Sequence, residues 1–215
     1  MKNKSDTKEA PTISDDQEID LSILLELGSI GAGHAATALS DVLQQPILID
    51  VPKIHNVQAH LIPKFYNQHE TSTTAVYLQL TDTYGCDILL MFEVTEAKKI
   101  AAMMTFASSI EELDPNMETS AINELTNILI GSFLTAISDF LGITLLPTIP
   151  QSTTDSFDAI IDSFLIRQSL LSENALIFET RFKRQGEDAK CILMIFPSRD
   201  LKELLAQKSK ALIKI

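Results

Sequence analysis

Glu124 and Asn127 are the two residues of this sequence whose types and spacing best suit chemistry. They lie three residues apart in a stretch with helical periodicity, so their side chains share one helix face. The carboxylate can pair with a cation on a partner, and the carboxamide can hold a water molecule in line by donating and accepting hydrogen bonds. Neither group is a strong nucleophile, and no His, Cys or metal-binding cluster surrounds them in the sequence. The pair therefore suits a site that inserts into another protein's active site.

The stretch from Ser120 to Gly142 must position this pair, and it is predicted to be one long amphipathic helix. At about 100° per residue, one narrow line on that helix carries Ser120, Glu124, Asn127, Gly131 and Ser138. Apolar residues cover most of the remaining circumference. A helix that is buried nearly all round usually leaves only a solvent-facing line, so exposure alone would explain the polar residues.

An internal repeat gives this polar line more weight. Subtracting 98 from each residue number maps Ser120 to Ser22, Glu124 to Glu26 and Pro150 to Pro52 without a gap. The same offset maps Asn127 to Ser29, which breaks the identity. A serine has a shorter reach than an asparagine and one fewer heavy atom with which to orient a water molecule.

The repeat predicts two half-domains of one fold. Each half is expected to hold one long helix, about three strands and one short helix, and the halves are expected to join edge to edge. The predicted fold is α+β, with one pseudo-two-fold antiparallel sheet covered by the two long helices. We expect a disordered tail over residues 1–17 and a single domain over 18–210, made of repeats at about 18–110 and 114–207.

The local patterns place further elements. A first long helix is expected from about Leu21 to Leu43, and short helices from Thr95 and from Ser198 to about Leu205. A short helix or turn is expected over Thr153 to Ser163. Strands are expected at 47–51, 73–80, 86–92, 143–148, 175–183 and 190–196, with 54–62 either a strand or an irregular crossing.

Composition narrows the classes of function. The 215-residue chain is 45% hydrophobic and carries a net charge of -12, from 29 acidic and 17 basic side chains. Free nucleic acid and anionic membranes are therefore poor partners. The N-terminus has no apolar region typical of a signal peptide, and the apolar run Ile128–Ile137 is shorter than the roughly 20 residues that span a bilayer. Cys86 and Cys191 lie in apolar runs, which indicates core residues in a reducing, cytoplasmic setting.

One motif favours a different activity. The segment around Gly31 and Gly33 matches the dinucleotide-binding pattern G-x-G-x-x-A, and Asp50 follows where a ribose-binding acid belongs. That interpretation needs a strand over Ser22–Ile30, whereas the equivalent segment of the second repeat has a helical pattern. In a helix Gly28, Gly31 and Gly33 would each cost on the order of 1 kcal/mol, which close crossing of the two long helices would explain. A dinucleotide-binding enzyme using Gly31–Gly33 stays as a distant alternative, and the neighbouring His34 has no partner motif.

The spacing Asp/Ser-x3-Glu-x2-Asn-x22-Pro resembles the signature of the CheC, CheX and FliY family of chemotaxis phosphatases. The second repeat fits this pattern completely, with Ser120, Glu124, Asn127 and Pro150. The first repeat fits at Ser22, Glu26 and Pro52 and departs from it at Ser29. Two copies favour a CheC-type protein, and the resemblance covers about residues 18–205.

The resemblance implies hydrolysis of the aspartyl phosphate of a CheY-like response regulator. Glu124 would pair with a lysine of the regulator, and Asn127 would orient the attacking water. The regulator would supply the phospho-aspartate, Mg²⁺, lysine and threonine, so no metal or other cofactor is expected in this chain. Glu26 and Ser29 would form a degenerate second site. Because Ser29 lacks the carboxamide, the alternative is a weakly catalytic or non-catalytic module that binds phosphorylated CheY and CheD.

The resemblance also implies a second partner. A CheD-type deamidase is expected to contact the short helix after Pro150, at about Thr153–Ile161, with Asp155 as a candidate contact. We expect a monomer in the cytoplasm.

Overall fold

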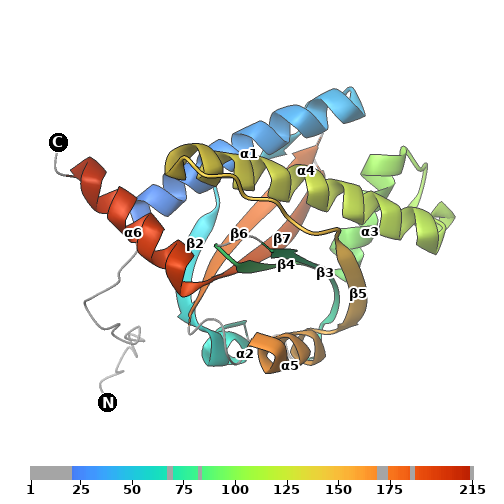
Figure 1. Ribbon diagram of the computed structural model, residues 1–215. Coiled ribbons are helices and arrows are strands. Elements are labelled where there is room, and N and C mark those ends of the chain that lie inside the picture. Colours follow the sequence, from blue (N-terminus) through green and yellow to red (C-terminus); the bar gives the residue numbers. More distant parts are fainter. Residues whose placement is uncertain (1–20, 67–69, 82–83, 169–173, 185–186, 214–215) are drawn as a thin grey trace, which may run out of the picture.

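The computed structural model describes residues 21–66, 70–81, 84–168, 174–184 and 187–213. Two long helices, α1 (Leu21–Leu43) and α4 (Pro115–Leu141), lie side by side and run in opposite directions over one face of a seven-stranded antiparallel sheet (Figure 1). The predicted α+β fold is confirmed. The tail predicted over residues 1–17 lies outside the described residues, and the predicted domain limits stay predictions.

The sheet is built from strands of both repeats. The first repeat supplies β1 (Leu48–Ile49), β2 (Lys53–Gln58), β3 (Ser72–Leu80) and β4 (Cys86–Glu93). The second supplies β5 (Gln151–Ser156), β6 (Asn174–Arg184) and β7 (Glu187–Pro197). Their order is β1-β6-β7-β4-β3-β5, and β2 also pairs with β6.

The two repeats exchange their outer strands. The centre of the sheet is the β4–β7 pair, where the halves meet edge to edge as expected. Beyond it, however, β2 of the first repeat pairs with β6 of the second, and β5 of the second pairs with β3 of the first. α1 itself lies against the second repeat, because Gly28 packs beside Phe178 of β6 and, just after the helix, the Gln45 side chain accepts a hydrogen bond from Arg184 at 2.7 Å. The chain that leaves α1 is therefore already next to the other repeat, and the halves interlock.

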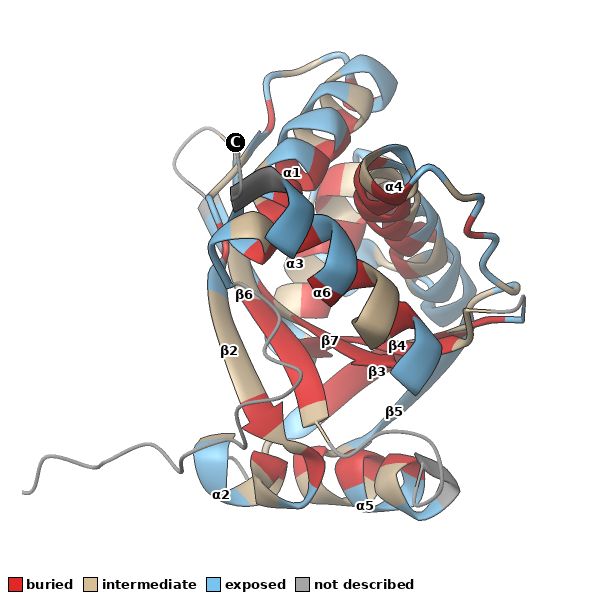
Figure 2. Cartoon of the chain, turned by 60° about the vertical axis from the view of Figure 1, so that its left-hand side comes forward, coloured by how far each residue is buried: buried red, intermediate tan, exposed pale blue. Residues whose placement is uncertain are grey.

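Helices cover both faces of the sheet. On the face of α1 and α4 lie α3 (Val94–Thr105) and α6 (Arg199–Ile213), whereas α2 (Ile62–Tyr66) and α5 (Phe157–Gln168) lie on the other face (Figure 2). Two hydrophobic cores result, one on each face. In β4, Ile88 and Leu90 belong to one core and Leu89 and Met91 to the other. A strand buried on both sides reads as a continuous apolar run, as this one does.

Some predicted elements are corrected. The second long helix begins at Pro115, five residues earlier than expected, because Asp114 caps it. Residues 143–148 form no strand; Pro147 makes a single bridge with Leu80, and a proline lacks the N–H that a strand ladder needs. The last helix continues to Ile213 rather than ending near Leu205.

The apolar character of α4 follows from its place in the fold. Among the described helices it is the one whose length and composition would suit a membrane span, and half of its apolar stretch is buried in the protein. Leu125, Leu129 and Phe133 point into the core. Cys86 and Cys191 are likewise buried, as predicted for core residues.

Candidate functional site

The capped helix α4 fixes the second-repeat site. The Asp114 side chain accepts hydrogen bonds from the backbone N–H groups of Asn116 (2.8 Å) and Met117 (3.4 Å), and Pro115 occupies the first helical turn. At the other end, Gly142 adopts a left-handed conformation (φ 72°) and closes the helix. The site between these ends therefore stands on a regular helix rather than on a loop.

The polar line of α4 faces solvent where the candidate residues lie. Ser120, Glu124 and Asn127 are exposed, whereas Ile122 and Leu125 on the same turns are buried. The predicted amphipathic pattern is confirmed. Exposure on a rigid helix leaves the carboxylate of Glu124 and the carboxamide of Asn127 available to an incoming protein.

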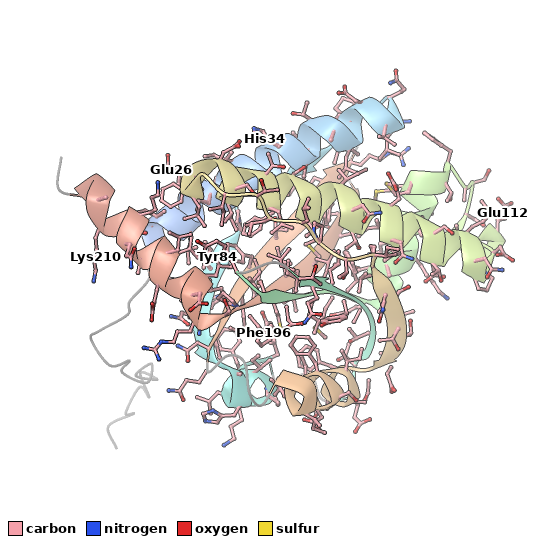
Figure 3. The ribbon with its side chains drawn as sticks, viewed as in Figure 1. Glu26, His34, Tyr84, Glu112, Phe196 and Lys210 are labelled. Carbon is pink, nitrogen blue, oxygen red and sulfur yellow. The ribbon has the colours of Figure 1, made fainter. Side chains whose placement is uncertain are left out.

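The first-repeat site lies on α1 at the equivalent positions, but it has Ser29 where the second repeat has Asn127. Ser22 and Glu26 are exposed on α1, and Figure 3 shows Glu26 and His34 on the side of that helix that is turned away from the sheet. Ser29 donates its hydroxyl hydrogen bond to the backbone oxygen of Leu25, at 2.7 Å. This hydroxyl is engaged within its own helix, so the first site presents a carboxylate without a free carboxamide.

The two sites lie apart. Because α1 and α4 run in opposite directions and cross where Gly31 meets Phe133, Glu26 and Glu124 lie on opposite sides of the crossing point. Each precedes the crossing in its own helix. The arrangement therefore gives two separate sites rather than one composite site.

Each signature proline ends a segment that passes beside its long helix. Pro52 is buried, and it lies 3.0 Å from where a Cβ of Gly28 would be. The two segments are held by equivalent backbone hydrogen bonds, Asp50 N–H to Arg181 O (3.0 Å) and Thr148 N–H to Gln79 O (2.8 Å). Pro52 thus packs on the buried side of α1, and the half-buried Pro150 occupies the equivalent position in the second repeat.

The dinucleotide-binding interpretation is wrong. α1 is helical through Gly28, Gly31 and Gly33, so no strand precedes the glycines. Asp50 forms an ion pair with Lys183 (2.6 Å) instead of standing free for a ribose. Gly28 and Gly31 serve close packing, as the alternative explanation required, whereas a Cβ at Gly33 would meet no atom within 4 Å.

Asp155 is placed differently from the expectation. It lies on strand β5, not on a helix, and it is exposed, with its side chain accepting from the Ser156 N–H at 2.7 Å. β5 pairs with β3 over its whole length, which explains why residues 153–156 are extended. The helix that follows Pro150 is α5, which begins at Phe157.

A cavity of about 330 Å³ lies elsewhere, and sequence reasoning gave no sign of it. It opens on the sheet face of α2 and α5, where Tyr66 of α2 and Phe157 of α5 line it. Its lining includes Tyr66, Thr73, Met91, Phe157, Glu179 and Lys190. Burial, followed by the charge of Glu179, raises the pKa of Tyr66 well above its ordinary value. Neither Glu124 nor Asn127 borders this cavity.

No group of three or more His, Cys, Asp or Glu side chains in the described ranges could hold a metal ion. Glu124 and Asn127 present an exposed carboxylate and an exposed carboxamide. They can bind a cation and orient a water molecule.

A family model of the CheC-like family matches residues 19–55 and 117–153. The two matches are again 98 residues apart, and each spans one long-helix line together with its proline. The chain belongs to the CheC-like family. Both candidate sites thus lie in the parts of the chain that match the family.

Named relatives agree with this membership. The CheC-like chain is 28% identical to the CheY-P phosphatase CheC of Bacillus subtilis over 194 residues, which cover 88% of this chain and 93% of that protein. It is also 28% identical to the flagellar motor switch phosphatase FliY of Bacillus subtilis, over 62% of this chain and 35% of FliY. The crystal structure of Thermotoga maritima FliY has the same fold, with a TM-score of 0.71 and 23% identity over 88% of this chain and 95% of that one.

Proposed function

We propose that this CheC-like chain accelerates hydrolysis of the aspartyl phosphate of a CheY-type response regulator. The observation that carries the proposal is the complete pair Glu124 and Asn127, exposed on the capped helix α4. The Bacillus subtilis relative that matches nearly the whole chain is named as a CheY-P phosphatase. The reaction is hydrolysis, and the second repeat carries the one intact active site.

Glu124 and Asn127 have different roles in the proposed reaction. The Glu124 carboxylate pairs with a lysine that the regulator presents beside its phospho-aspartate, which docks α4 against the phosphoryl group. The Asn127 carboxamide then accepts and donates hydrogen bonds to one water molecule and holds it in line with the P–O bond that breaks. Because phosphoryl transfer depends mainly on positioning and electrostatics, holding the water contributes directly to the rate.

The regulator brings the remaining groups. Mg²⁺ bound to the regulator would neutralise charge on the phosphoryl oxygens, and the regulator's own lysine and threonine would contact the same oxygens. This chain supplies only the water-holding amide and the docking carboxylate. That division matches a site whose two side chains stand exposed on a helix.

The first repeat carries an equivalent site that lacks the carboxamide. Glu26 is exposed like Glu124, so it can make the same docking contact. Ser29 donates its hydroxyl hydrogen to Leu25 O and has no amide with which to fix a water molecule. We therefore assign docking without efficient hydrolysis to this repeat.

A CheD-type deamidase is the second partner that we propose for the CheC-like chain, with its contact on α5 and with Asp155 at the edge of that surface. Replacing Asp155 by arginine should weaken CheD binding, and an unchanged affinity would remove Asp155 from the contact.

We also propose that the chain acts as a monomer in the cytoplasm. Light scattering of the purified chain tests the oligomeric state.

Loss of phosphate from a phosphorylated CheY-type regulator tests the proposed function. Addition of the chain should shorten the lifetime of the aspartyl phosphate in proportion to the chain's concentration. Tight binding of the phosphorylated regulator with an unchanged lifetime of the aspartyl phosphate would instead select the alternative, a module that only sequesters the regulator. The serine at position 29, where the second repeat has Asn127, favours this alternative for the first repeat.

A further inference from the structure

The cavity on the α2 and α5 face has no part in the proposed reaction. Its volume of about 330 Å³ is that of a small-molecule site, which typically spans about 300–1,000 Å³. None of its lining residues belongs to the acidic sites of α1 and α4. The cavity therefore has room for a small ligand of its own.

The sheet forms the floor of this cavity. Glu179 of β6 is paired with Ile192 of β7, and Ile192 is paired with Met91 of β4. Met91 belongs to the core on the α2 and α5 face, and Ile192 packs against it. Because side chains alternate along a strand, Arg181 and Lys190, each two residues along from this row, lie on the same face.

The lining is layered by depth. Its deepest residues are apolar, the half-buried ones carry a phenol and a carboxylate, and the rim carries two cations. In that order they are Met91 and Phe157, Tyr66 and Glu179, and Arg181 and Lys190. Of the other lining acids, Asp50 and Glu96 are in ion pairs and Glu93 is exposed. From the floor outward, a bound molecule would meet apolar groups, then Glu179, then the cations.

The half-buried layer suits a cationic group. The Tyr66 hydroxyl is shielded from solvent and has no well-formed hydrogen bond to a described residue, which is costly for a buried polar group. Glu179 has one ion-pair contact in the described chain, with His55 Nε2 at 3.9 Å. An ammonium group could donate to both the carboxylate and the phenol oxygen. The aromatic rings of Tyr66 and Phe157, with centroids 5.5 Å apart, also favour a cation.

The rim suits an anionic group. Arg181 and Lys190 lie directly opposite each other on β6 and β7, an arrangement in which like charges repel. Asp188 relieves Arg181 through a contact of 3.4 Å. Lys190, and Lys53 on the same rim, make no ion pair with another described residue. A carboxylate bound between these cations would offset their repulsion.

We infer that the cavity binds a small zwitterion with an apolar side chain, of the class of the apolar α-amino acids. The side chain lies against Met91 and Phe157, the ammonium group meets Glu179 and Tyr66, and the carboxylate meets the cations of the rim. Glu179 and Lys190 are diagonal neighbours on adjacent strands, a separation that long side chains can bridge across a small ligand. A zwitterion has no net charge, so the net charge of -12 of this chain does not repel it as it would a simple anion.

Three related probes test the inference on the full chain by calorimetry at neutral pH. L-Leucine carries both charges, N-acetyl-L-leucine lacks the cation, and L-leucinamide lacks the anion. We expect leucine to bind with a Kd of about 1 mM or below, and each analogue to bind about 10-fold more weakly or worse, because each loses one charged contact. The Met91 methyl resonance, assigned through Met91→Leu, should shift when leucine is added to the wild type.

Two substitutions separate the charged contacts. Glu179→Gln and Lys190→Gln should each weaken leucine binding about 10-fold, whereas Glu112→Gln, an exposed acid outside the cavity, should leave it unchanged. Thermal unfolding should show that each variant is folded, and the wild-type probes and the Met91 resonance decide the question if one is not. Leucine that does not bind, or that leaves the Met91 resonance in place, would overturn the inference. Equal binding of leucine and either analogue would overturn it too, because one charged contact would then be missing.

Discussion

Gly31 of α1 packs against the backbone of Phe133 in α4. A methyl group at position 31 would lie 2.9 Å from the Phe133 Cα atom, closer than non-bonded carbon atoms approach. The two helices that carry the acidic pairs therefore touch through a glycine, and this contact sets where Glu26 and Glu124 stand relative to each other.

Replacing Gly31 by alanine should destabilise the protein. Alanine gains about 1 kcal/mol of helix propensity, but the overpacked methyl group costs about 1–3 kcal/mol, and backbone atoms of Phe133 have little freedom to move. We expect the cost to prevail. Gly33→Ala is the matched control, because its methyl group meets open space, and it should stabilise the protein. Urea unfolding measures both, and a Gly31→Ala variant as stable as Gly33→Ala would contradict the close crossing.

Removing the cap of α4 should lower stability. Asp114→Ala leaves the N–H groups of Asn116 and Met117 without their acceptor, and loss of such a cap costs about 1 kcal/mol. Asp114→Asn, which keeps an acceptor at the same place, should recover most of that loss. If the two substitutions were equally harmful or both harmless in chemical denaturation, the capping role would be wrong.

Introducing asparagine into the first repeat should create a second working site. Ser29→Asn restores the carboxamide beside Glu26, whose carboxylate is already exposed on α1. Phosphate release at saturating regulator should rise to about twice the wild-type rate, as expected for two independent sites. The double variant Ser29→Asn/Asn127→Ala should then recover activity that Asn127→Ala has lost. No gain in either background would mean that the first repeat has lost docking as well.

The two cysteines should be inert in the folded protein. Both are buried, and burial raises the pKa of the Cys191 thiol far above its ordinary value. A thiol-reactive dye at neutral or mildly alkaline pH should label neither residue until denaturant is added, when both should react.

The same raised pKa sets the sign of a pH effect. Above the ordinary thiol pKa of about 8.5, unfolded Cys191 loses a proton that the folded protein keeps, so stability falls as pH rises. The Cys191→Ala variant should show a shallower fall between neutral and alkaline pH. A steeper fall would contradict this sign.

The repeat made most of the fold predictable from the sequence. The offset of 98 related the two long helices and marked the place where Ser29 departs from Asn127. It also showed that the glycines near Gly31 belong to a helix, because the second repeat has no glycine-rich turn there. Local patterns sufficed because each of these elements buries one well-defined face.

Long-range pairing was not visible in the sequence. Residues 153–155 are exposed on an edge strand, so they lack the alternation that marks a strand with one buried face, and the sequence pattern predicts a helix there instead. The exchange of β2 and β5 depends on where α1 and α4 lie, which no local pattern reports.

The effect of Asn127→Ala on the lifetime of a regulator's aspartyl phosphate tests the central claim most directly. Ser29→Ala is the paired control, because it makes the same kind of change at the equivalent place in the other repeat. We expect Asn127→Ala to lower the acceleration about 10-fold or more. Binding of a regulator loaded with beryllium fluoride, a stable mimic of the aspartyl phosphate, should persist, and Ser29→Ala should keep the wild-type rate. Equal acceleration by wild type and Asn127→Ala would contradict the assignment of the working site to α4.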